Sequence, residues 1–376
     1  MATLAVAISL AVMIITVSVG KAFNENIRNK MFGFWGHIQL TNIASVPGVD
    51  ERPLLKDSIF KADVSQEKWF QRYNTYALKP AIIKTKDAIN GIVVKGVSDD
   101  FSWEAFEEYV IEGQVPAEKN EVLISKTIAD RLDFKVGDKL RLFFIQKPPR
   151  ARAPVISGIY NTNLVELDEQ IVFTDISHIQ KLNGWSENEV SGVEIFVDIP
   201  ERSRYYADIV RNDYTDYQKL VQSLDETNPQ IFDWLGIIKT PEYVILGLMT
   251  LVAIVNMASM LLVIILERTN MIGVLKAIGA PYSLIRNVFL HKAAYIILWG
   301  LLLGNLLGIG LAWIQQRFEV ISLDPESYYL SVVPIHIHLP TILLLNLATI
   351  LVILLALLLP SLMIKRVNPV QALRFK

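Results

Sequence analysis

Four apolar segments constrain this chain more than any other feature, because each is long enough to cross a lipid bilayer as a helix. They cover residues 2–19, 243–266, 293–314 and 339–364. A bilayer core about 30 Å thick needs roughly 20 apolar residues in a helix. Backbone groups in hydrocarbon must also be paired within their own segment. We therefore predict four membrane-spanning helices, one at the start of the chain and three near its end.

The segment between the first and second spans, 24–240, has an ordinary globular composition. The chain as a whole is 52% hydrophobic with a mean hydropathy of +0.35, whereas a soluble protein of this length usually has a negative value. Within this segment Ile89–Val97 and Gly192–Val197 are β-rich. Helical spacing is found at Ser125–Leu132, with Ser125 as N-cap, at Ser177–Leu182 and at Tyr205–Leu224, and Pro148–Pro154 has the composition of an exposed loop. The predicted fold class is an α-helical membrane protein with four transmembrane helices (1+3) and a large mixed α/β extracytoplasmic domain between helices 1 and 2.

The first apolar segment has a cleaved signal peptide as its alternative interpretation. However, no Lys or Arg precedes the apolar run, the run is long for a signal peptide, and no clear A-x-A site follows it. We therefore favour a retained helix. Because the chain starts inside this helix without a cytoplasmic lead, we expect the natural start to lie upstream of Met1.

Basic residues near the spans predict the orientation of the chain. The connector 267–292 carries four basic residues and one acidic residue, and the tail 365–376 carries four basic residues and no acidic one. The connector 315–338 has one basic residue against three acidic ones. Because cytoplasmic loops are enriched in Lys and Arg, we place 267–292 and the tail in the cytoplasm. The 24–240 domain and the 315–338 loop then face outside.

These assignments divide the chain into eight segments. They are transmembrane helix 1 (1–23), the extracytoplasmic domain with its stalk (24–240), transmembrane helix 2 (241–266), a cytoplasmic amphipathic segment (267–281), transmembrane helix 3 (282–314), an extracytoplasmic loop (315–338), transmembrane helix 4 (339–364) and a cytoplasmic tail (365–376). Gly20–Phe34 and Asn228–Lys239 continue helices 1 and 2 outward, and we expect them to form the stalk. An ordinary aromatic membrane interface is the alternative interpretation.

The residues that usually carry chemistry are scarce. The chain has no cysteine and a net charge of −2, so it offers no thiol nucleophile, no Cys-ligated metal and no basic face for nucleic acid. His336 and His338 form an H-x-H pair at a membrane edge without acidic neighbours, and we interpret them as interfacial polar residues. No G-x-x-x-x-G-K-[ST] string is present, so the chain itself cannot hold ATP phosphates in a P-loop. We predict no catalytic residue, no metal and no bound cofactor.

The amphipathic segment 267–281 reads E-R-T-N-M-I-G-V-L-K-A-I-G-A-P. Met271, Leu275 and Ile278 fall on one helical face, with Val274 beside them. Gly279 can end this helix in a left-handed cap, and Pro281 can start the next. The apolar face suits either a cytoplasmic protein partner or the lipid surface, and the spacing alone does not decide between them.

This string resembles the signature of the FtsX-like permeases, the family that includes the lipoprotein-releasing and macrolide-exporting ABC permeases. The run 113–140 (GQVPAEKNEVLISKTIADRLDFKVGDKL) looks like the family's extracytoplasmic domain, and the closing NPVQALRF, 368–375, resembles its P-x-x-A-L-R tail. The one-plus-three topology also agrees. The stretch 324–334 (DPESYYLSVVP) is similar to one in the lipoprotein-releasing branch.

The resemblance implies that 267–281 is the coupling helix, which docks into a cytoplasmic ABC ATPase dimer that binds ATP and magnesium. The implied ATPase contacts are Glu267, Arg268, Gly273, Val274, Leu275, Lys276, Ile278 and Gly279. Implied substrate contacts at the outward ends of the first two spans are Phe23, Phe32, Phe34 and Trp35. A second permease chain, identical or paralogous, would complete the transporter in the bacterial inner membrane, with the large domain in the periplasm.

For the releasing branch, the resemblance implies extraction of lipoproteins from the outer leaflet of the inner membrane and their transfer to a periplasmic carrier. Two permease alternatives remain open: a mechanotransmitter that activates a cell-wall hydrolase, and a macrolide-type efflux permease. A membrane-anchored enzyme is disfavoured by the lack of a nucleophile or metal cluster. The 324–334 stretch favours the releasing branch.

Overall fold

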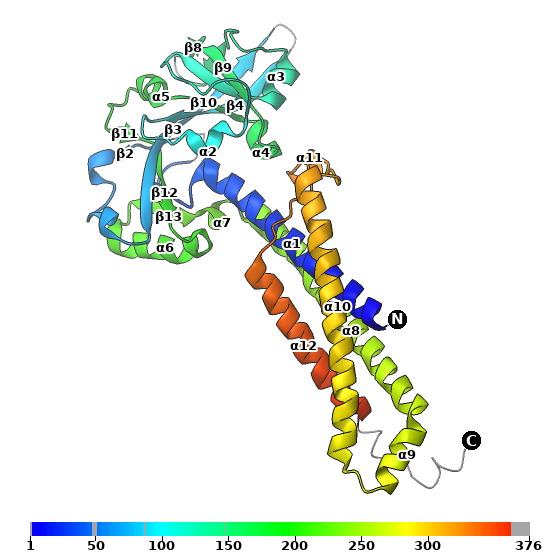
Figure 1. Cartoon of the computed structure of the whole chain (residues 1–376). Helices are drawn as coiled ribbons and strands as arrows, with labels where there is room; N and C mark the ends of the chain where they lie inside the picture. Colours follow the sequence, from blue (N-terminus) through cyan, green and yellow to red (C-terminus); the bar gives the residue numbers. More distant parts are fainter. Residues whose placement is uncertain (1, 47–50, 86–87, 147, 362–376) are drawn as a thin grey trace. The chain divides into compact units, whose positions relative to one another are not determined.

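The computed structural model describes residues 2–46, 51–85, 88–146 and 148–361, and the chain divides into two compact units (Figure 1). We call one the membrane unit; it comprises 1–26, 234–323 and 332–376. The other, the α/β unit, comprises 27–233 together with the short segment 324–331. The α/β unit therefore draws on two parts of the chain that are far apart in sequence.

The membrane unit is built from long helices. Their bounds are Ala2–Trp35 for α1, Pro229–Glu267 for α8, Tyr282–Phe318 for α10 and Leu339–Ser361 for α12, with the short α9 at Thr269–Ala277. Each long helix contains a window apolar and long enough to cross a membrane, which confirms the four predicted spans. Helices α1 and α8, with 34 and 39 residues, are much longer than a bilayer requires. The tail 365–376, with its motif at 368–375, lies outside the described residues.

A row of glycines lets α1 and α10 approach closely. Gly300, Gly304 and Gly308 occupy one face of α10, and a Cβ atom on Gly304 would lie 2.8 Å from the Ala7 carbonyl oxygen and 3.0 Å from Leu10 Cβ. Small residues four apart permit such backbone approach between membrane helices. We did not predict this contact, although its signal, glycine at every fourth position of a span, is present in the sequence.

The α/β unit contains one large mixed sheet with the strand order β13-β1-β12-β3-β4-β10-β6-β9-β5, to which β7 and β8 are attached through β3. The strands are β1 (Ile38–Asn42), β3 (Phe70–Lys84), β4 (Ile89–Val97), β5 (Val110–Gly113), β6 (Glu121–Ser125), β7 (Leu142–Phe144), β8 (Arg150–Arg152), β9 (Val155–Tyr160), β10 (Ile171–Asp175), β12 (Gly192–Val197) and β13 (Lys219–Ser223), and β2 (Leu54–Leu55) pairs separately with β11 (Glu189–Val190). The pairs β4–β10 and β6–β9 are parallel and the other pairs are antiparallel. This confirms the mixed α/β class.

Short helices connect and cover the strands. They are α2 (Glu104–Glu107), α3 (Lys126–Leu132), α4 (Val165–Asp168), α5 (Ile176–Asn183), α6 (Ser203–Ile209), α7 (Leu224–Thr227) and α11 (Pro325–Tyr328). Ser125 caps α3 as predicted, because its side chain accepts a hydrogen bond from the Ile128 amide. Two local predictions are wrong. The helical pattern at 205–224 ends at Tyr214, and Lys219–Ser223 pairs with β1 as β13; Arg150–Arg152 is a strand, paired with β7, rather than a loop.

Candidate functional sites

Helix α9 occupies the predicted coupling segment. Ile272 and Gly273 are buried, and Ile272 belongs to an apolar cluster of the membrane unit that includes Ile285 and Phe289 of α10. Met271, Val274 and Ile278 are exposed, and Ile278 is 75% accessible. Because these three residues recur at intervals of three and four, they form one outward apolar face. We name Met271, Val274 and Ile278 the α9 outer face.

The turn after α9 is fixed by a glycine cap. Gly279 has φ of +89°, a conformation that glycine adopts without steric cost. Its amide donates to the Lys276 carbonyl at 3.1 Å, and the Ala280 amide donates to the Leu275 carbonyl at 2.9 Å. This pair of bonds is a Schellman motif, so the predicted left-handed cap is confirmed. Pro281 is the N-cap of α10, one residue before the helix that we expected it to start.

The structure distributes the eight predicted ATPase contacts unequally. Glu267, Arg268, Val274, Ile278 and Gly279 are exposed, Leu275 and Lys276 are half-buried, and Gly273 is buried. The predicted helix face grouped Leu275 with Met271 and Ile278. The structure instead turns Leu275 inward beside Ile272, because the start of α10 packs on that side. The face open to a partner therefore centres on Val274 rather than on Leu275.

Within the α/β unit, the end of α1 contacts the start of α8. The rings of Phe32 and Phe232 lie 6.2 Å apart, and the Arg28 guanidinium lies over both rings at 5.5 and 5.3 Å. Within the membrane unit, Phe23 and Trp234 form a second ring contact at 5.9 Å. Helices α1 and α8 are thus paired by aromatic contacts in each unit, beyond the apolar parts that span the bilayer.

The four predicted substrate contacts do not share one environment. Phe34 is 1% exposed and is surrounded by Phe106, Tyr160 and Phe173, and Phe32 is 4% exposed. Side chains buried to this degree cannot touch an external substrate in this conformation, so both are corrected to core residues. Phe23 is also buried, at 7% exposure and in ring contact with Trp234, so Trp35 is the one of the four that stays partly exposed.

Trp35 differs from the other three because it borders a cavity of about 300 Å³. The cavity lies within the α/β unit, and its walls are Met31, Trp35, Leu164, Leu167 and the segment 227–231. Its apolar walls come from α1, from the region of α4 and from the start of α8, whereas Thr227, Asn228 and Gln230 add polar groups. A cavity of this kind suits an apolar group with a polar end.

A buried ion pair fastens the end of α1 to the sheet. Lys95 of β4 and Glu194 of β12 are 1% and 0% exposed, and Lys95 Nζ lies 2.5 Å from Glu194 Oε1. Lys95 also donates to the Phe34 carbonyl at 2.5 Å and lies 4.4 Å from the Trp35 ring centroid. Burial raises the pKa of Glu194 and lowers that of Lys95, and the contact between the two groups opposes both shifts. Neither residue was identified from the sequence.

His37 follows directly after α1 and is also buried. Its Nδ1 accepts a hydrogen bond from the Val197 amide at 2.8 Å, which requires that this nitrogen carry no proton. Burial, with Arg72 nearby, lowers the pKa of His37 to about 4. His37 is therefore neutral at physiological pH and serves as a structural acceptor.

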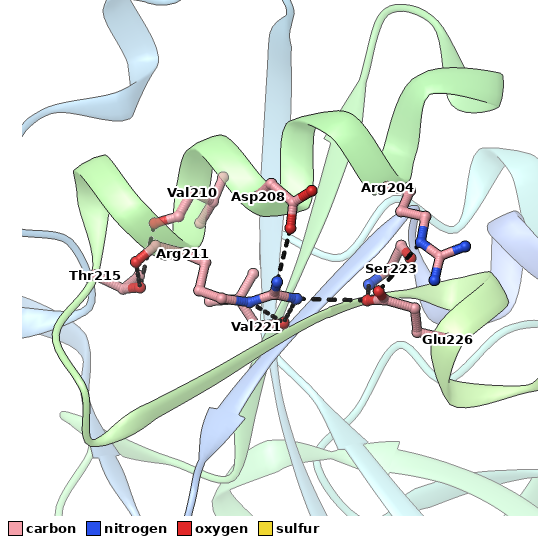
Figure 2. A network of polar contacts seen from close by, with 8 residues as sticks. All are labelled: Arg204, Asp208, Val210, Arg211, Thr215, Val221, Ser223 and Glu226. Carbon is pink, nitrogen blue, oxygen red and sulfur yellow. Dashed lines mark hydrogen bonds and ion pairs between the residues drawn. The ribbon is translucent and has the colours of Figure 1, made fainter.

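A network of polar contacts connects α6, β13 and α7 just before α8 begins (Figure 2). Arg211 donates to the Val221 carbonyl at 2.7 Å and to Asp208 at 2.7 Å. Glu226 accepts from the Ser223 amide at 3.0 Å and forms ion pairs with Arg204 and Arg211. The network fixes α7 and gives α8 a defined starting point on the α/β unit.

Lys30 of α1 holds the separate segment 324–331 on the α/β unit. Its Nζ donates to the Thr162 carbonyl at 2.8 Å and to the Tyr329 carbonyl at 3.1 Å. Thr162 in turn donates from its amide and hydroxyl to Asp168, whose pKa burial raises to about 6. Of the stretch 324–334 that resembles the releasing branch, residues 324–331 are therefore part of the α/β unit, and 332–334 belong to the membrane unit.

The H-x-H pair has an acidic neighbour, Glu25, which we did not expect from the sequence. His336 Nδ1 lies 3.2 Å from Glu25 Oε2, and the cavity beside His336 and His338 has a volume of about 10 Å³. In the part of the chain that the structure describes, no group of three or more His, Asp or Glu side chains could hold a metal ion. His336 contacts a carboxylate at the end of the first span, as an interfacial polar residue does.

Comparisons with known proteins identify the family. Residues 1–207 match the MacB-like periplasmic core domain, and residues 243–369 match the FtsX-like permease C-terminal domain. The lipoprotein-releasing system transmembrane protein LolE of Haemophilus influenzae is 22% identical, with 98% of this chain and 92% of the relative covered. LolC of Neisseria meningitidis serogroup B is 21% identical, with 99% and 92% covered.

Among solved structures, the periplasmic region of MacB from Actinobacillus actinomycetemcomitans covers 52% of this chain and 91% of its own, at 9% identity and a TM-score of 0.34. The family matches together cover both the α/β unit and the spans that follow it, and they place the chain in the bacterial inner membrane with a periplasmic domain. The chain therefore belongs to the FtsX-like permeases of ABC transporters that carry a MacB-like periplasmic core domain.

Proposed function

We propose that this chain is the permease subunit of an ABC transporter that extracts lipoproteins from the outer leaflet of the inner membrane for transfer to a periplasmic carrier. The observation that carries this proposal is the similarity to lipoprotein-releasing permeases over more than nine tenths of both chains. ATP and magnesium would bind in separate ATPase chains, and a second permease would complete the complex.

The α9 outer face supports contact with an ATPase. Met271, Val274 and Ile278 are apolar and exposed, and the charged residues Glu267 and Arg268 lie just before the helix. An amphipathic helix with an apolar face and a charged border fits a groove on a soluble protein. The Schellman turn holds α9 at a set angle to α10, so a push on α9 would be passed on to α10 rather than absorbed by a flexible loop.

The aromatic pairing of α1 with α8 supports transmission of movement towards the periplasm. Because Phe32–Phe232 and Phe23–Trp234 join these helices in each unit, we expect α1 and α8 to move together. Trp35 and its cavity are the substrate-contact candidates that remain accessible, and we propose that they meet an acyl chain of the lipoprotein anchor.

Crosslinking tests the contact with the ATPase. The chain lacks cysteine, so Val274→Cys and Ile278→Cys each place one thiol on the α9 outer face. Val288→Cys on α10, where Val288 is 51% exposed, is the matched control. We expect a thiol-to-amine crosslinker to join the two α9 variants to a co-purifying ATPase and to leave the control unlinked. An active complex in which the control is linked as strongly as both α9 variants would contradict the proposal.

Depletion of the chain in cells tests the substrate. We expect lipoproteins destined for the outer membrane to accumulate in the inner membrane and to stay there when carrier is added to spheroplasts. Normal lipoprotein sorting, combined with a loss of cell-wall hydrolase activity or of drug efflux, would overturn lipoprotein release while leaving the family assignment intact.

A further inference from the structure

A basic cavity of about 520 Å³ lies on the α/β unit beside β7, and it shares no lining residue with the cavity at Trp35. Three cationic side chains, two phenyl rings and one hydroxyl group line it: Lys84, Lys139, Arg141, Phe134, Phe143 and Thr85. None of these described lining residues is a carboxylate. The size suits a small organic ligand, and the composition selects one that is negatively charged and partly apolar.

The strand pattern turns two of the basic side chains away from the core. Between residues 139 and 144 the even positions are buried, whereas the odd positions, Lys139, Arg141 and Phe143, are exposed. Successive side chains of an extended chain point to opposite faces, so these three share one face. Strand β7 pairs with both β3 and β8, which fixes the backbone that carries them.

The register of the sheet places two cations opposite each other. The ladder between β3 and β7 ends with Ile83 opposite Leu142, so the next position brings Lys84 opposite Arg141. Side chains directly opposite each other share a face with their Cβ atoms about 5 Å apart, and like charges there destabilise the pair. Within the segments that the structure describes, the side chains of Lys84, Lys139 and Arg141 make no hydrogen bond or ion pair. An anion bound between them would remove this repulsion.

The remaining wall of the cavity is also held in place. The Phe134 amide donates to the Ala129 carbonyl of α3 at 3.0 Å, and the Phe134 ring packs against the apolar core. In the turn that follows, Asp138 accepts a hydrogen bond from the Lys135 amide at 2.8 Å, so this carboxylate is engaged within its own turn. The cavity is therefore formed before a ligand arrives, which lowers the entropic cost of binding.

We propose that this cavity binds a phosphate monoester with an apolar organic group, presented to the domain in the periplasm. Such a group carries a charge of about −1.5 to −2 near neutral pH, which three cations balance better than they balance a single carboxylate. The Arg141 guanidinium offers paired N–H donors that match phosphate oxygens, whereas Lys84 and Lys139 supply point charges. Phe134 and Phe143 face the organic group. The site goes beyond lipoprotein release, because it belongs to the α/β unit alone.

Calorimetric titration of the full chain in a non-ionic detergent tests the site, with inorganic phosphate and phenyl phosphate as probes. Ionic strength is held at about 0.15 M, so that screening does not change during the titration. We expect one saturable site per chain and tighter binding of phenyl phosphate. Arg141→Gln should weaken both probes about 10-fold or more, because it removes charged hydrogen bonds. Lys135→Gln is the matched control: it removes the same charge from an exposed position outside the cavity and should change either affinity less than about 2-fold.

A second variant separates the phenyl wall from the charges. Phe143 is 41% exposed, so Phe143→Ala should fold. It should weaken phenyl phosphate about 2- to 10-fold and leave the affinity for inorganic phosphate unchanged. In phosphate-free buffer, Lys84→Gln should be at least as thermally stable as the wild type, because it relieves the repulsion with Arg141.

A soluble metabolite and a lipid can both carry a phosphate monoester. Glycerol phosphate and dioctanoyl phosphatidic acid, titrated in the same detergent, distinguish these two sources. Tighter binding of glycerol phosphate would support the site with a soluble ligand, and tighter binding of phosphatidic acid would support it with a lipid headgroup.

Three results would overturn the inference. They are no saturable binding of either probe below about 10 mM, equal losses of affinity in Arg141→Gln and Lys135→Gln, and equal affinities of the wild type for phenyl phosphate and inorganic phosphate. None of these measurements needs ATP, an ATPase or a lipoprotein. Failure of the phosphate site is therefore separable from failure of the proposed function.

Discussion

Replacing Lys95 by methionine should destabilise the α/β unit more than any surface substitution. The change keeps most of the side-chain volume but leaves Glu194 buried without its cation, and Glu194 Oε2 already has no hydrogen-bond partner among the described residues. At 2.5 Å and an effective dielectric constant of about 20, the Coulomb attraction is about 7 kcal/mol before desolvation is subtracted. Breaking one partner of a buried pair typically costs about 3–5 kcal/mol, and we expect Lys95→Met to fall in that range.

The pH dependence of the variant follows from the raised pKa of Glu194. Its reference value is 4.5, and burial raises the pKa in the folded state; without Lys95 this shift grows. The folded state then binds a proton more tightly than the unfolded state does. The contribution of the Glu194 carboxyl to the free energy of unfolding is fully present below pH 4.5, and it is lost as the pH rises through the folded-state pKa. The loss of unfolding free energy in Lys95→Met, relative to the wild type, should therefore be larger at pH 8 than at pH 5.

Hydrogen exchange on the full chain in detergent, read on peptides from β4 and β12, gives the free energy of opening at both pH values. The control is the double variant Lys95→Met/Glu194→Met, which replaces the pair by apolar groups of similar size and should recover to within about 1–2 kcal/mol of the wild type. A single-variant cost below about 1 kcal/mol, or a double variant as unstable as the sum of both singles, would refute the reasoning.

Three other predictions concern different parts of the chain. Because the pKa of His37 falls to about 4 in the folded state, neutral His37 contributes about 3 kcal/mol to the free energy of unfolding. This contribution should be lost as the pH falls from 6.5 towards 4. Chemical denaturation at pH 7 and pH 5 should therefore show a smaller pH dependence of the unfolding free energy for His37→Gln than for the wild type. Gly304→Ala should lower the free energy of unfolding by about 1–3 kcal/mol, because the added methyl group overpacks against α1. Gly310→Ala should leave stability unchanged, because no atom lies within 4 Å of a Cβ at that position. Equal thermal stability of the two variants in detergent would contradict this prediction. Gly279→Ala should strain the Schellman turn by about 1–2 kcal/mol and lower ATPase stimulation, with Gly279→Asn milder; unchanged ATP turnover in both variants would show that this turn does not transmit movement.

Features that depend on local sequence were predictable. The four spans follow from the length of apolar runs, and β4 has the predicted bounds, Ile89–Val97, because turn residues flank a β-branched run. The Gly279 cap follows from one glycine after an amphipathic turn. In each case the determining residues are neighbours in the sequence.

Features that depend on distant contacts were not predictable. Phe34 continues an amphipathic-looking helix end, and only the sheet packed around it shows that it is a core residue. Lys95 and Glu194 are 99 positions apart, and each looks like a surface charge on a strand. The predicted face of α9 contained Leu275, whereas the α9 outer face contains Val274 in its place. Which side of α9 is covered depends on where the start of α10 packs, and the sequence of α9 alone does not show this.

The attachment of 324–331 to the α/β unit bears on how the protein is made. Most of the α/β unit has been synthesised once the chain reaches residue 233. Lys30, however, can donate its hydrogen bond to the Tyr329 carbonyl only after α8 and α10 have also been synthesised. At about 5–20 residues per second, the 91 residues from 233 to 324 impose a delay of about 5–20 s. During that interval the exported domain lacks segment 324–331, so the surface around Lys30 to which this segment binds is exposed. The nascent chain is therefore open at this point to chaperones and proteases, and correct insertion of α10 becomes a condition for finishing a domain that precedes it in the sequence.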